Sequence, residues 1–154
     1  MKTWIWFVAL AVLSWGAYVP TVHHGANSFG GGRGSFRAFL FVGVAYFLMA
    51  GAILAYLALT KTEPLLISSK GATLSTLAGL CGAMGALGVI FATSPGLGGS
   101  PLVVAPLVFA GAPIVNTLVS MLWDKPAKSP GALFYVGLIL AACGAALVLR
   151  FRPT

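Results

Sequence analysis

The sequence predicts an all-α integral membrane protein, a bundle of five transmembrane helices. Hydrophobic residues make up 59% of the 154 residues, charged residues only 7%, and the apolar residues gather into five long runs. A soluble domain carries about 25% charged residues, so this chain has too few charges to build a surface that faces water. We therefore expect the lipid bilayer to surround most of it.

Charged and turn-forming residues separate the five apolar runs. Each run has roughly 20–24 residues, and a helix needs about 20 to cross a hydrocarbon core of ~30 Å. Backbone groups in lipid must pair within the protein, which allows helices or closed barrels, and the runs lack the polar alternation of barrel strands. The expected helices form a single membrane domain, residues 1–154, and cover about 3–22, 38–60, 71–94, 101–123 and 131–150.

The first run has two interpretations. Lys2 followed by the apolar residues 4–13 resembles the start of a secretory signal peptide. However, no small-residue cleavage site follows, and Trp15, Tyr18 and Pro20 are bulky where a peptidase needs small side chains. We expect this run to be retained as a helix, with cleavage as the alternative.

The connection after the first run is the longest. Residues 23–37 include three consecutive glycines, which a helix accommodates only at a cost, so we expect a loop there. His23 and His24 are adjacent and cannot share one helix face, and we expect them to be solvated at the membrane surface rather than to bind a metal.

The basic residues divide almost evenly between the two sides of a five-helix arrangement. One side holds Lys2, Lys61, Lys70, Lys125 and Lys128, and the other holds Arg33, Arg37, Arg150 and Arg152. By this narrow margin the positive-inside rule places the N-terminus in the cytoplasm. Either other determinants fix one orientation, or copies insert both ways and pair antiparallel, as the inverted repeats of many transporters do.

The chain lacks the residues that catalysis and metal binding usually need. Its two acidic residues, Glu63 and Asp124, lie between apolar runs, which argues against paired-carboxylate chemistry and carboxylate metal sites. No phosphate-binding loop or base-reading motif is present. We therefore expect no enzymatic activity, no cofactor, no metal site and no nucleic-acid partner.

The fourth run contains Pro106, Pro113 and the amide of Asn116. Prolines bend a membrane helix and free backbone carbonyls, which fits a helix that lines a pathway as well as an irregular structural helix. A buried amide in lipid needs a partner, which is either another helix or a ligand.

Two segments carry a family resemblance. The stretch from Pro113 to Asp124, with the Gly- and Ala-rich residues 136–148, resembles the end of an EamA-type repeat of the drug/metabolite transporter superfamily. The segment Trp15-Gly-Ala-Tyr-Val-Pro20 resembles the Trp-Gly element that ends the first helix of such repeats. The chain departs from the family in having Asp124 where a Glu is usual, and in its long, glycine-rich first connection.

The resemblance implies a function and a set of site residues. Typical members carry two repeats in one chain. A single repeat therefore implies either a homodimer, in which the two copies can be antiparallel, or a partner membrane subunit. By the same resemblance, the residues that face the central cavity and bind substrate are Trp15, Gly16, Tyr18, Pro20, Pro113 and Asn116. We expect a small-molecule (metabolite or drug-like) permease, multi-pass in the bacterial inner (plasma) membrane. The alternative is a structural or assembly subunit of a larger membrane complex.

Overall fold

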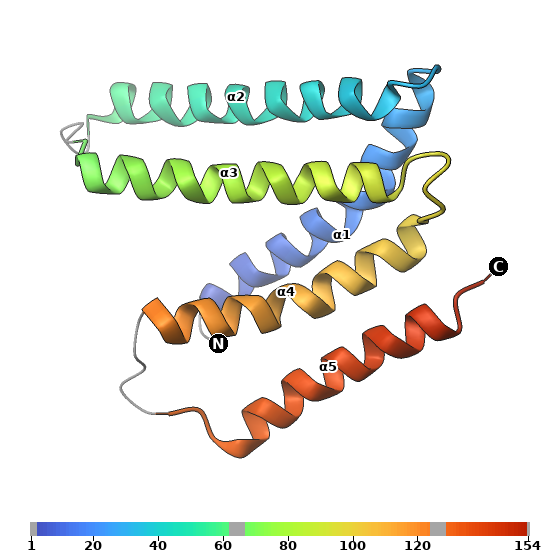
Figure 1. Ribbon diagram of the computed structural model, residues 1–154. Coiled ribbons are helices and arrows are strands. Elements are labelled where there is room, and N and C mark those ends of the chain that lie inside the picture. The colour runs from blue at the N-terminus through green and yellow to red at the C-terminus, as the bar shows by residue number, and fades with distance from the viewer. Residues whose placement is uncertain (1–2, 62–66, 124–128, 154) are drawn as a thin grey trace. The chain divides into compact units, whose positions relative to one another are not determined.

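The computed structural model describes residues 3–61, 67–123 and 129–153, and within these ranges it contains five α-helices and no strand (Figure 1). All five helices are long and apolar enough to cross a membrane, which confirms the all-helical, five-helix prediction at that level. The helices are α1 (Trp4–Ser28), α2 (Gly34–Thr60), α3 (Ser69–Ala92), α4 (Pro101–Trp123) and α5 (Ala132–Arg150).

Packing divides the chain into two compact units, residues 1–98 with α1 to α3 and residues 99–154 with α4 and α5. Each unit is described by itself below. A single domain of all five helices stays a prediction.

The first connection is shorter than the sequence predicts. α1 continues to Ser28 instead of ending near residue 22, and α2 begins at Gly34 instead of residue 38. The polar residues that follow the apolar run contain no proline, and Ser28 Oγ donates to the carbonyl of His24 at 2.8 Å. The expected loop over 23–37 was wrong because a helix can extend past its apolar segment into polar surroundings.

The chain reverses within residues 29–33, between α1 and α2. Gly30 and Gly31 adopt left-handed backbone conformations, with φ of 62° and 69°, which only glycine adopts without strain. The Arg37 guanidinium donates to the carbonyls of Phe29 and Gly30, both at 3.3 Å. The glycine run therefore forms the turn, and the hydrogen bonds of Arg37 stabilise it.

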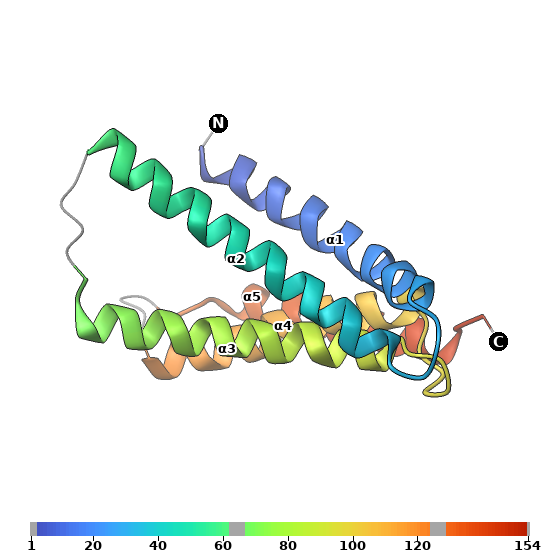
Figure 2. The same ribbon diagram turned by 90° about the horizontal axis from the view of Figure 1, so that it is seen from above.

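In the unit of residues 1–98, the three helices contact one another pairwise and share their buried core at one end. That core is the cluster of Val22, Ala26, Ala38 and Ile90. Figure 1 shows α1 and α2 diverging away from the connection between them, and Figure 2 shows α2 and α3 diverging from the same end. The closed end lies next to the connection, and the other halves of the helices are splayed.

The closest backbone approach in this unit lies at its closed end. Gly34 is buried, and a Cβ atom placed on it would lie 2.2 Å from the carbonyl oxygen of Ala26. Glycine at this position lets the start of α2 contact the end of α1 directly.

In the unit of residues 99–154, α4 and α5 pack against each other and run in opposite directions (Figure 1). Pro106 and Pro113 both lie inside α4, as the sequence predicts. Along its described length, α5 has no buried residue.

Candidate functional site

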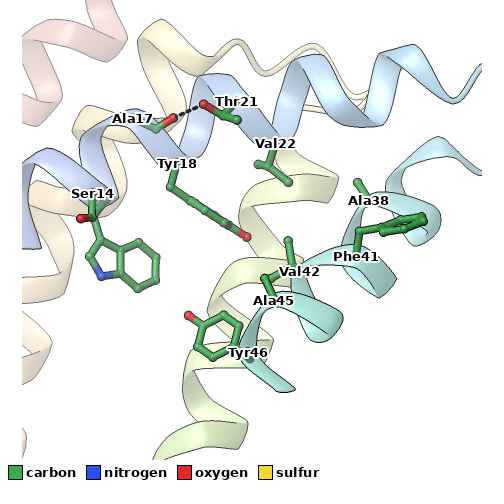
Figure 3. A pocket seen from close by; sticks show the side chains of 11 residues that line it. Ser14, Ala17, Tyr18, Thr21, Val22, Ala38, Phe41, Val42, Ala45 and Tyr46 are labelled. Atoms are coloured by element: carbon green, nitrogen blue, oxygen red, sulfur yellow. Dashed lines mark hydrogen bonds between the residues drawn. The ribbon is translucent and has the colours of Figure 1, made fainter. Parts of the chain in front are cut away.

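A cleft of about 590 Å³ lies between α1 and α2, where the two helices begin to diverge. Its lining comes from one face of each helix (Figure 3): Ser14, Trp15, Ala17, Tyr18, Thr21 and Val22 of α1, and Ala38, Phe41, Val42, Ala45 and Tyr46 of α2. The lining residues recur at spacings of three and four along each helix, which places them on one face. None of them carries a charge.

Aromatic side chains dominate the cleft. The rings of Trp15 and Tyr18 lie edge to face, with their centroids 5.4 Å apart and an interplanar angle of 61°. Phe41 stacks on Phe29 at 5.5 Å. Figure 3 shows the rings of Tyr18 from α1 and Tyr46 from α2 projecting into the space between the two helices. Such rings offer flat apolar surface together with polar edges.

The Tyr18 hydroxyl has an unusual environment. Its ring packs against the buried core cluster defined above, and its oxygen is buried with no hydrogen-bond partner among the described residues. The nearby Thr21 hydroxyl, by contrast, donates to the Ala17 carbonyl at 2.7 Å. Most buried polar groups are paired, so this hydroxyl is a candidate to bond a molecule in the cleft.

Only some of the site residues predicted on the first helix line the cleft. Trp15 and Tyr18 line the cleft, whereas Gly16 and Pro20 are exposed on α1 and do not line it. Because each residue turns an α-helix by about 100°, Gly16 and Pro20 fall on the side of α1 opposite to the lining residues. A role in substrate binding stays a prediction for all four.

The two predicted residues of the fourth helix lie in the other unit. Pro113 and Asn116 are on α4 and are exposed within the unit of residues 99–154. Their role in lining a pathway stays a prediction. Asp124, which contributes to the family resemblance, lies outside the described residues.

The lining residues of α2 were not among the predicted site residues. Ala38, Val42 and Tyr46 are spaced by four and share a face, so this signal was present in the sequence. The same spacing occurs on other faces of α2. Only the packing of α2 on α1 identifies the face that borders the cleft.

A polar cluster links the three helices at the closed end. His23 Nδ1 bonds the carbonyl of Thr93, the residue after α3, at 3.0 Å, and Asn27 Nδ2 bonds His23 Nε2 at 3.0 Å. The Ser35 and Ser94 hydroxyls bond each other across α2 and the end of α3. With Asn27 as donor, a neutral His23 protonated on Nδ1 satisfies both of its bonds.

The expected solvation of the adjacent histidines is therefore corrected for His23, which is partly buried and bridges α1 to α3, while His24 is exposed. A second cavity, of about 560 Å³, borders this cluster and the glycine turn. Within the described ranges no three His, Cys, Asp or Glu side chains come together as a metal site.

Comparisons of the chain with protein-family models, with curated proteins and with solved structures found no match.

Proposed function

We propose that the chain is a multi-pass membrane protein that acts as a small-molecule permease, as a dimer of single repeats. The observation that carries the proposal is the aromatic cleft between α1 and α2, to which Trp15 and Tyr18 of the Trp-Gly element contribute. The resemblance implies that these two residues bind substrate, and both of them also line the cleft.

Membrane insertion accounts for the surface of the helices. Phe47 is 78% exposed, Leu59 84% and Leu133 85%, and many other large apolar side chains of the helices are exposed as well. Soluble monomers rarely expose contiguous apolar patches of more than a few hundred Å². In lipid such side chains cost nothing to expose, so the bilayer is the solvent that fits them.

The cleft has the size and character of a small-molecule site. Ligand pockets generally span about 300–1,000 Å³ and combine apolar walls with a few polar groups, and this cleft of about 590 Å³ falls within that range. A polar group without a partner at membrane depth is costly, which favours a functional reason for the Tyr18 hydroxyl.

In the proposed function, a second chain completes the transport pathway, which one repeat leaves open on one side. Among the described residues, those that border the cleft belong to α1 and α2, and the splayed halves of α1 to α3 contribute none to the buried cluster. A second copy, inserted in the same or the inverted orientation, would close a pathway between repeats in the manner of two-repeat transporters.

Uptake by the purified protein in liposomes tests this function. We expect at least one of a panel of labelled amino acids, sugars and nucleosides to enter saturably above protein-free liposomes. The double variant Trp15→Ala, Asn116→Ala should lose that uptake, while Tyr56→Phe, outside the cleft, should keep it. Equal uptake by the wild type and the double variant would contradict the proposed site.

A structural or assembly subunit of a larger membrane complex is the second candidate. It is favoured by α5, whose described residues are all at least partly exposed, as expected of a helix that a partner covers. Copurification of a stoichiometric membrane partner, with no uptake by the pure chain, would favour this candidate over the permease.

A further inference from the structure

We propose that the α1–α2 cleft takes an uncharged ring-shaped molecule with a hydrogen-bond acceptor, and that this acceptor bonds the Tyr18 hydroxyl. The inference rests on the proposed function, because it names the substrate class of the same site. It is carried by the uncharged lining of the cleft and by the orphan hydroxyl at its edge.

The lining selects against charged ligands. Among the described residues no acidic or basic side chain borders the cleft, so an anion or a cation would leave water without gaining a counter-ion there. Aromatic faces attract cations, but this attraction alone repays only part of the lost hydration. An uncharged molecule avoids that cost and still gains contact with the rings of Trp15 and Tyr46.

The hydroxyl requires an acceptor from the ligand. A phenol can donate one hydrogen bond, and the Tyr18 hydroxyl donates none within the described chain. The Thr21 hydroxyl already donates to Ala17, whereas the buried Tyr18 hydroxyl has no partner among the described residues. A carbonyl, ether or hydroxyl oxygen of the ligand would complete it.

Binding is coupled to a movement of Tyr18. Its hydroxyl oxygen is enclosed among the packed helices, while its ring lines the cleft. An acceptor can reach the oxygen only when the ring turns into the cleft or when α1 and α2 separate further. A ligand with an acceptor favours the opened arrangement, because only there does it make the extra bond.

Fluorescence of Trp15 can report binding. Replacing Trp4, Trp6 and Trp123 by Phe leaves Trp15 as the one tryptophan, and the protein is then placed in lipid nanodiscs. The probes are benzamide, benzoate and benzamidinium, which have nearly the same shape and charges of zero, minus one and plus one. We expect benzamide to shift the emission saturably, and the two ions to bind at least roughly 10-fold more weakly.

A matched pair of tyrosine variants tests the hydrogen bond. Tyr18→Phe should weaken benzamide binding roughly 3- to 10-fold, the effect of losing one neutral hydrogen bond. Tyr56→Phe removes a hydroxyl from α2 outside the cleft and should leave binding unchanged. Calorimetric titration of the unmodified protein gives a second measure that does not depend on the tryptophan replacements.

Each outcome bears on the inference separately from the permease. Tighter binding of benzoate or benzamidinium, an equal effect of the two tyrosine variants, or no saturable binding of any probe would overturn the ligand class. Benzamide binding that depends on Tyr18 would support it even if the liposome panel showed no uptake, a result that would count against the permease alone.

Discussion

Tyr18 is the residue at which stability and the proposed function conflict most, because its hydroxyl is buried without a partner but is proposed to bond the ligand. Burying a hydroxyl without a partner costs about 1–3 kcal/mol, and the closed end of α1 to α3 carries that cost. Most buried polar groups in folded proteins are paired, so an unpaired one calls for an explanation, and ligand binding is the one proposed here. Tyr18→Phe should therefore change stability and ligand binding in opposite directions.

Tyr18→Phe should raise the free energy of unfolding of the ligand-free protein by about 1 kcal/mol, because it removes an unsatisfied buried group and keeps the ring. Thermal or denaturant unfolding in detergent, followed by circular dichroism, measures the change. Tyr56→Phe, at an exposed ring, is the control and should have little effect. A clear loss of stability in Tyr18→Phe would mean that the hydroxyl has a partner in the folded protein.

His23 makes the opposite kind of contribution, since both of its ring nitrogens are paired. His23→Ala should lower the free energy of unfolding by about 1–2 kcal/mol, because it leaves the Thr93 carbonyl without its side-chain donor. His24→Ala, at the exposed neighbour, should change it by less than about 0.5 kcal/mol. The same unfolding measurement compares them, and equal losses would contradict the bridge between α1 and α3.

At the scale of elements, the meeting of α1 and α2 depends on Gly34. A methyl group there would overlap the Ala26 carbonyl, so Gly34→Ala should cost about 1–3 kcal/mol by forcing the two helices apart. Gly51→Ala lies on the same helix in open space and should change stability by less than about 1 kcal/mol. If Gly34→Ala were as stable as Gly51→Ala, the close approach would not exist in the folded protein.

The helices themselves were predictable from the sequence, because length and hydropathy are local properties of each run. Their ends were less predictable. α1 continues from Val22 through Ser28, where polar side chains bond the preceding turn and hydropathy no longer indicates the helix. The glycines at 30 and 31 correctly marked the reversal, since their conformation is dictated by the residue type.

The site was only partly predictable. Trp15 and Tyr18 emerged from a motif on one helix, and both line the cleft. Tyr46 required knowledge of which face of α2 meets α1. The bond from His23 to Thr93 joins positions 70 apart, which no local pattern can indicate. Contacts between helices depend on which faces pack together, and the hydropathy of each segment does not indicate this.

At the scale of the whole molecule, the near-even distribution of basic residues leaves the membrane orientation weakly biased. A reporter fused to the C-terminus distinguishes the two alternatives, with signal from both sides of the membrane if copies insert both ways and from one side if other determinants fix the orientation. Adding two lysines beside Lys61 should move most of the signal to one side, because the basic residues then divide seven to four. Signal from a single side in the unaltered chain would exclude antiparallel pairing.

The central claim is that one chain is half of a transport pathway and works as a pair. Native mass spectrometry of the protein released from lipid nanodiscs measures this most directly. The predicted result is a species of twice the 15.8 kDa mass of one chain, retained under gentle activation. A species of one chain only, under conditions in which the protein is folded and binds ligand, would contradict the claim.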